Sequence, residues 1–187
     1  MLSEGVAVLL NQTSNLRFRL DLVQRLSDGV HTPAALQIAA AVESYQHPKA
    51  GGREEHGFAP LVTLPQAALL DLDLIAFLQA LEQLLEQLDR PQPEGAPQPF
   101  AALDATVDPS LALRIGGGPG VAQVEVGLDL RAILEPMGGR RGEPGHDLAL
   151  FRFFCDARPL ASFCAQLIAE FQAFPTDPSK VAKGEPA

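Results

Sequence analysis

The sequence lacks several residue types that would point to a particular class of protein. It has no tryptophan, only two cysteines, two methionines and one tyrosine among 187 residues. Two cysteines are too few for the disulfide scaffold of a small secreted domain, so the sequence favours a reducing compartment. A chain of this length can bury a hydrophobic core without such cross-links.

Long apolar runs are also missing. The first one, residues 6–10, follows no basic region and is too short for a signal peptide or a membrane span. No later segment approaches the roughly 18 consecutive apolar residues of a membrane helix. We therefore predict a soluble, cytoplasmic protein that does not enter a membrane.

Basic residues are scarce. Lys and Arg total 14 against 23 Asp and Glu, which gives a formal net charge of −9 and a pI of about 4.8. A nucleic-acid interface needs clustered Lys and Arg, so we predict no nucleic-acid partner. The acidity suits a basic protein partner through complementary fields, although acidity also serves solubility alone.

Alternating apolar and polar residues predict eight half-buried strands. The clearest alternation is at residues 123–131, where Val124, Val126 and Leu128 are separated by polar residues or glycine. The other predicted strands cover residues 5–10, 16–22, 36–43, 58–64, 100–104, 111–115 and 148–155.

Two segments have the period of an amphipathic helix, residues 74–88 and 160–174. In each, an apolar residue recurs every three or four positions, which predicts a single buried stripe. Asp71 or Asp73 is expected to cap the first helix and Asp156 the second, and prolines follow both.

The two apolar stripes match at a constant offset, since Leu160 lies 86 positions after Leu74. Each stripe follows about four predicted strands. We therefore predict two similar four-strand-plus-helix halves, residues 1–90 and 100–175, which arose by duplication or by convergence. A proline-rich junction at 91–99 joins them, and a flexible tail covers 176–187. Hairpin-length loops favour an α+β fold with antiparallel sheets over a doubly wound parallel sheet.

The cysteines are predicted to be structural. Cys155 and Cys164 are nine positions apart, whereas metal and redox pairs place two thiols within two to four residues of each other. Cys164 also falls on the apolar stripe of the second helix. Cys155 precedes a helix start, so its pKa is expected to be lowered if the thiol is exposed.

No other motif predicts a catalytic, cofactor or metal site. The glycine-rich residues 116–120 precede a strand rather than a helix, so they predict a hairpin turn instead of a phosphate-binding loop. The histidines fall in predicted loops without the spacing of a helical metal site. They are His31, His47, His56 and His146.

The first helix carries the most distinctive surface feature. Glu82, Glu86 and Asp89 are spaced by four and three positions, so they form one acidic row, and Arg90 is the first basic residue after them. This acidic face is interpreted either as a docking surface for a basic partner or as an ordinary solvated face. The compensating charge is expected from Arg90, from a strand arginine such as Arg17 or Arg19, or from a partner.

The order of these features resembles that of the WapI-type immunity proteins of bacteria and their uncharacterised relatives. The matching segments are residues 69–84 (LLDLDLIAFLQALEQL), 109–115 (PSLALRI), 124–130 (VEVGLDL) and 160–175 (LASFCAQLIAEFQAFP). Such relatives often carry Asn-Trp-Leu at the start of an early strand, where this chain has no Trp and reads Pro33-Ala34-Ala35-Leu36. The resemblance implies a small acidic cytoplasmic protein that binds and neutralises a partner toxin, and it carries over no catalytic residue.

The sequence is consistent with three functions. The first is a non-enzymatic, immunity-like binding protein that needs no cofactor. The second is a structural or scaffold protein that forms homo-oligomers through sheet edges. The third is an enzyme or ligand-binding domain with a site between the two halves.

Overall fold

Two antiparallel sheets and two helices make up the fold. The computed structural model describes residues 6–26, 34–46, 57–88, 90, 97–104, 106–129 and 148–174. The first sheet has the order β1 (Ala7–Leu10), β2 (Leu16–Leu26), β3 (Ala35–Gln46), β4 (Gly57–Leu70), and α1 (Asp71–Leu88) follows it. The second sheet has the order β5 (Phe100–Asp104), β6 (Leu111–Gly118), β7 (Val121–Asp129), β8 (Leu148–Asp156), and α3 (Ala157–Ala173) follows it. The predicted α+β fold, with two four-strand-plus-helix halves, is confirmed.

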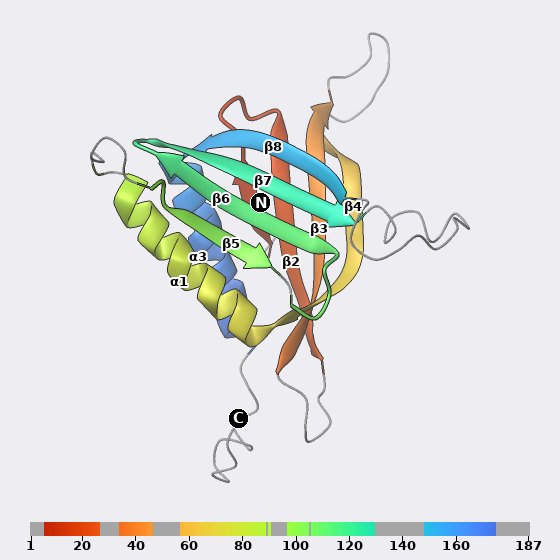
Figure 1. Ribbon diagram of the computed structural model, residues 1–187. Coiled ribbons are helices and arrows are strands. Elements are labelled where there is room, and N and C mark those ends of the chain that lie inside the picture. The colour runs from red at the N-terminus through yellow and green to blue at the C-terminus, as the bar shows by residue number, and fades with distance from the viewer. Residues whose placement is uncertain are drawn as a thin grey trace, which may run out of the picture.

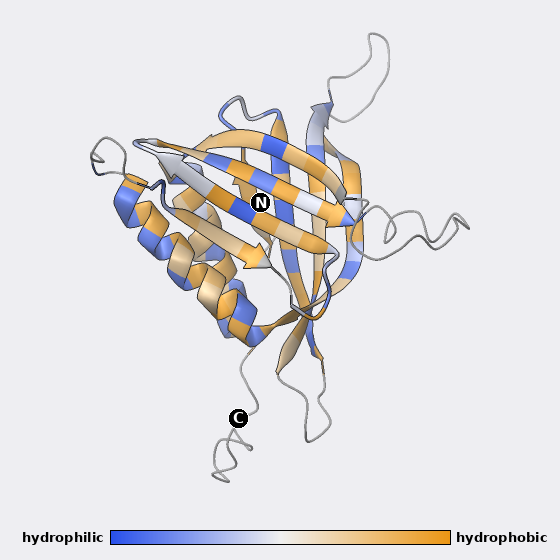
Figure 2. Ribbon diagram, in the orientation of Figure 1, coloured by the Kyte–Doolittle hydropathy of each residue, from blue (hydrophilic) through white to orange (hydrophobic). Residues whose placement is uncertain are grey.

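Each sheet buries one face because its strands alternate in sequence. Along β2, Phe18 and Leu20 are fully buried, whereas Arg17 and Arg19 point to the opposite face and are partly exposed. Hydrophobic and hydrophilic residues alternate in the same way along β6 and β7 (Figure 2). The buried faces of the two sheets are turned toward each other, with the two helices along one side (Figure 1).

The two halves interlock through their helices. α1 packs alongside β5, the first strand of the second half, and α3 packs alongside β1, the first strand of the first half (Figure 1). Gln166 on α3 accepts a hydrogen bond from the Val8 backbone N–H at 3.0 Å, and Asp73 on α1 accepts one from the Thr106 backbone N–H at 3.1 Å. Each helix therefore covers an edge of the sheet to which it does not belong in sequence.

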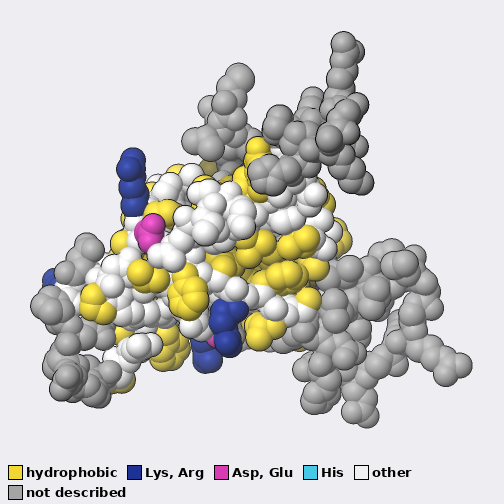
Figure 3. Space-filling view, turned by 90° about the horizontal axis from the view of Figure 1, so that it is seen from above, with side chains coloured by type: hydrophobic (Ala, Val, Ile, Leu, Met, Phe, Trp, Pro, Cys, Tyr) yellow, Lys and Arg dark blue, Asp and Glu magenta, His cyan; other side chains and the backbone are white. Residues whose placement is uncertain are grey.

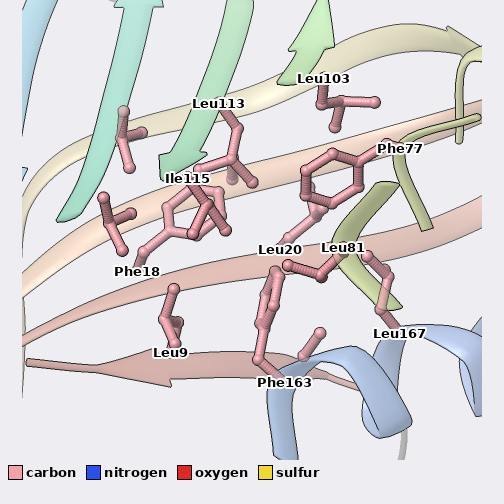
Figure 4. Packing of buried hydrophobic residues seen from close by; sticks show 14 of the residues in the cluster. Leu9, Phe18, Leu20, Phe77, Leu81, Leu103, Leu113, Ile115, Phe163 and Leu167 are labelled. Atoms are coloured by element: carbon pink, nitrogen blue, oxygen red, sulfur yellow. The ribbon is translucent and has the colours of Figure 1, made fainter. Parts of the chain in front are cut away.

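A single hydrophobic core joins all four components. Most residues of the predicted helix stripes are buried, and both Leu81 and Leu167 are inaccessible to solvent. Figure 4 shows their side chains converging with those of both sheets. The residues labelled there are Leu9, Phe18, Leu20, Phe77, Leu81, Leu103, Leu113, Ile115, Phe163 and Leu167.

Asp156 is the N-cap residue of the second helix, as predicted, but its side chain does not cap the helix. Asp156 has an extended backbone at the start of α3 and makes no capping hydrogen bond. Its Oδ1 instead accepts a hydrogen bond from Gln12 Nε2 at 2.8 Å. The reason is tertiary: the turn between β1 and β2 lies beside the end of β8, where the Gln12 backbone N–H also donates to the Phe154 carbonyl at 2.9 Å.

A hairpin joins β6 to β7 at the glycine-rich segment, as predicted: Gly116–Gly118 end β6, and Pro119 and Gly120 form the turn. Gly120 has a φ of +79°, a value that favours glycine, and Pro119 precedes it as in a type II turn. A Cβ at position 117 would overlap the Val121 carbonyl oxygen and lie 2.8 Å from the Ala122 Cα. At position 118 a Cβ would meet nothing within 4 Å.

We therefore expect Gly117→Ala to lower the free energy of unfolding by about 1–3 kcal/mol, because the backbone of β7 must move to admit the methyl group. Gly118→Ala is the matched control, with an expected change within about 0.5 kcal/mol. Chemical denaturation followed by circular dichroism measures both. Equal stabilities of the two variants would contradict the close approach of β6 and β7.

Candidate functional site

One side of α1 faces solvent and changes character along the helix. Leu72 and Ile75 are exposed near its start, Gln79 is exposed in the middle, and Glu82 and Glu86 are exposed near its end. Residues three and four positions apart share a helix face, so these five side chains form one row, which we call the α1 stripe. The stripe therefore joins an apolar end to an acidic end.

The two glutamates of the α1 stripe have no counter-ion among the described residues. The last turn of α1 has no basic side chain, and no described arginine forms an ion pair with Glu82 or Glu86. Carboxylates four positions apart near a helix C-terminus repel each other and oppose the helix dipole. Asp89, the third residue predicted for this face, lies outside the described residues.

Arg17 and Arg19 do not compensate the acidic row, contrary to expectation. They lie on the outer face of the first sheet, where both pair with the buried Glu43, Arg19 at 3.4 Å. Arg19 also lies 3.3 Å from Asp21, and the Arg17 guanidinium stacks over the Phe58 ring at 4.2 Å. Strand alternation puts these charges on a different surface from α1, so they neutralise one another.

A second ionic contact ties the helices to β2. Arg25 forms an ion pair with Asp71, at the start of α1, with an N–O distance of 2.7 Å. The same guanidinium donates to the Phe174 carbonyl, just after α3, at 2.6 Å. Arg25 therefore links the start of α1 in the first half to the end of α3 in the second half. Asp71 is its ion-pair partner in this contact.

Glu170 is a buried carboxylate that the sequence reasoning did not single out. It is only 6% exposed, and its Oε2 accepts a hydrogen bond from the Leu22 backbone N–H at 3.4 Å. Its Oε1 is buried without a partner among the described residues. Burial raises the pKa of Glu170 to about 7; the Leu22 hydrogen bond opposes this rise and the Asp21 carboxylate adds to it.

The sequence does contain a signal for Glu170. It lies seven positions after Phe163, on the buried stripe of its helix, and the 86-residue offset aligns it with Leu84 of the first half. A carboxylate at a position where the matching helix has leucine indicates a buried charged group. Arg25 carried no comparable signal, because its partners are distant in sequence.

Both cysteines lie in the core as free thiols, as the structural interpretation requires. Burial raises the pKa of Cys155 to about 12, and the nearby Asp156 carboxylate contributes to the rise. Burial also raises the pKa of Cys164, with a smaller contribution from Glu82. Cys155 was expected to be reactive only if its thiol were exposed and its pKa lowered. The thiol is buried and its pKa is raised, so little of the nucleophilic thiolate forms.

The described part of the chain contains no group of three or more His, Cys, Asp or Glu residues placed to hold a metal ion. The four histidines, the proline-rich junction from 91 to 96 and the tail after residue 174 lie outside the described residues. No helix within the described ranges is both long and apolar enough to cross a membrane.

Comparisons of this chain with protein-family models, with curated proteins and with solved structures found no match. The likeness to immunity proteins therefore rests on the sequence segments quoted above.

Proposed function

We propose that this protein is a non-enzymatic, cytoplasmic binding domain of the immunity type, whose α1 stripe holds a basic protein partner such as a toxin. The observation that carries the proposal is the position of Glu82 and Glu86, which are solvent-exposed, one helical turn apart and without a described counter-ion. A basic partner would relieve their mutual repulsion. The net charge of −9 would also attract such a partner from a distance.

The apolar end of the stripe adds an anchor to this charge. Leu72 is 70% exposed and Ile75 is 37% exposed. Helices that dock into a partner's groove present apolar anchors at intervals of three or four residues, and charged residues beside the anchors set the orientation. The α1 stripe has this arrangement, so we expect the partner to offer an apolar groove with Lys or Arg at one end.

The first test identifies a partner by its position on the protein. A photo-crosslinking amino acid is placed at the exposed Gln83, beside the two glutamates, and in a control at the exposed Gln66 on β4. We expect a basic protein to be trapped at position 83 and not at position 66. The absence of any such protein at position 83 would contradict the proposal.

The second test measures the role of the charges with that trapped partner. The double variant Glu82→Gln, Glu86→Gln should keep or slightly raise the melting temperature, because it removes a like-charge pair. Its association rate should fall by roughly threefold to tenfold at low salt and by less at high salt. Stopped-flow kinetics measures the rate. A melting temperature lowered by several degrees would mean that these carboxylates are paired within the fold.

A ligand-binding or enzymatic site between the two halves has less support. The centre of that interface is apolar, with Phe18 of the first half packed on Phe163 of the second at a ring-centroid distance of 6.2 Å. Two polar groups described there, Arg25 and Glu170, each bond a backbone group of the other half. Pockets that bind small molecules combine an apolar lining with a few convergent polar groups.

A further inference from the structure

The two sheets have four edge strands, and three of them are protected. α3 covers β1, where Gln166 accepts from the Val8 N–H, and α1 covers β5. β4 contains Pro60 and Pro65, and its pairing with β3 shifts register near each proline. Asp108 also accepts a hydrogen bond from the Ala68 N–H of β4 at 3.2 Å. Cover, proline and bulges are the usual means by which proteins prevent strand edges from pairing.

Within the described part of the chain, the fourth edge strand, β8, has none of these protections along most of its length. It pairs with β7 in unbroken register and contains no proline. Leu150 is 61% exposed and Phe154 is 50% exposed. The one charged side chain between Leu148 and Phe154 is Arg152, which pairs with Glu125 of β7 at 2.7 Å. Hydrophobic side chains gather on this side of the molecule, which is seen from above in Figure 3.

One hydrogen bond shows which backbone groups of β8 face outward. The Phe154 carbonyl accepts from Gln12, which belongs to the turn after β1 and not to β7, so it points away from the sheet. Backbone groups alternate in direction along a strand, so those of Leu150 and Arg152 also point away from β7. The Gln12 contact occupies the edge at Phe154. The rest of the edge, centred on Leu150, makes no backbone hydrogen bond to the described residues outside β7.

We infer that β8 is a self-association edge, at which a second copy of this chain adds its own β8 in antiparallel orientation. A two-fold axis at Leu150 would join the two second sheets, four strands from each copy, into one continuous sheet. The partner must present an unprotected strand edge with apolar side chains on the same face. The same edge of a second copy meets this requirement, because under a two-fold axis each outward N–H meets an outward carbonyl.

The register of the two β8 strands follows from the charge of Arg152 and from the Gln12 contact at Phe154. With the axis at Leu150, the two leucines face each other, and Arg152 lies opposite residue 148 of the second copy. An axis at Arg152 would place two like charges directly opposite, which is destabilising, and would require the Phe154 carbonyl that Gln12 already engages. The axis at Leu150 avoids both conflicts.

This inference does not depend on the proposed function of α1. α1 lies at β5 and β8 is at the opposite edge of the same sheet, so pairing at β8 leaves the α1 stripe free. A dimer formed in this way would present two copies of the stripe.

The oligomeric state of the full chain tests the inference, measured by analytical ultracentrifugation over a range of concentrations. We expect wild type to dimerise and Leu150→Lys to weaken dimerisation at least about tenfold, because it sets two charges against each other at the axis. Leu72→Lys is the matched control, because Leu72 is also largely exposed but lies on α1, and it should dimerise like wild type. Circular dichroism should show all three chains equally folded. A wild-type chain that stays monomeric at every concentration, or equal weakening by both substitutions, would overturn the inference.

Cross-linking tests the register separately. Leu150→Cys and Leu72→Cys each add one exposed thiol, while Cys155 and Cys164 stay buried. A short bis-maleimide should link two chains through position 150 and not through position 72. A dimer whose position 150 does not cross-link would show that a different surface associates.

Discussion

Replacing Phe163 with alanine is expected to lower the free energy of unfolding by about 3–5 kcal/mol, the usual effect of removing a buried aromatic ring. Phe163 belongs to α3, yet it packs against Phe18 of β2 in the first half. It is inaccessible to solvent and lies between α3 and the first sheet, both of which are held by other packed side chains (Figure 4). The cavity would therefore remain and add its cost to the lost hydrophobic transfer energy.

Urea denaturation followed by far-ultraviolet circular dichroism measures this effect, since the chain has no tryptophan to report by fluorescence. Phe154→Ala is the matched control, because Phe154 is half exposed and its loss should cost less than about 1 kcal/mol. The interlocked helices also predict one cooperative transition for both halves. If the Phe163 variant unfolded in two steps, with the first half unaffected, the interlocking would not be the source of stability.

Replacing Glu170 with glutamine is expected to stabilise the protein at pH 8 and to have little effect at pH 5. Burial lifts the pKa of Glu170 from its ordinary value of 4.5 to about 7. The folded state therefore binds a proton that the unfolded state releases, and stability falls as the pH rises from about 4.5 through 7. At about 1.4 kcal/mol per pKa unit, the loss at pH 8 reaches up to about 3 kcal/mol.

Glutamine cannot ionise, so the variant avoids this loss while its amide oxygen can still accept the Leu22 hydrogen bond. The measurement is the difference in unfolding free energy between variant and wild type at pH 5 and at pH 8. Taking this difference removes the contribution of the other titrating groups. Glu86→Gln, at an exposed position, controls for the removal of one negative charge. A variant that is no more stable than wild type at pH 8 would show that Glu170 is ionised without cost.

The sequence by itself determined the secondary structure, because the period of the apolar residues depends only on local backbone geometry. The run from Val124 to Leu128 could bury one face only as a strand, and the stripe containing Leu81 could do so only as a helix. The same helical period placed Glu82 and Glu86 on the exposed side of α1.

Strand ends depended on context that the sequence did not reveal. β4 was predicted to end at Leu64, but it continues to Leu70 through Pro65. Proline usually interrupts a central strand, because it lacks the N–H that pairs with a neighbour. β4 tolerates it because it is an edge strand with a register shift at that point, and only the sheet order reveals an edge.

The tertiary structure alone decided which elements meet. The spacing of apolar residues predicts that a helix has a buried face, but it does not predict which strand or helix packs against that face. Only the fold shows that α1 lies on β5 and α3 on β1, that Arg25 joins Asp71 to the end of α3, and that Glu170 is enclosed against Leu22. These contacts span more than 100 residues in several cases, so their strength depends on burial and distance, which no sequence pattern encodes.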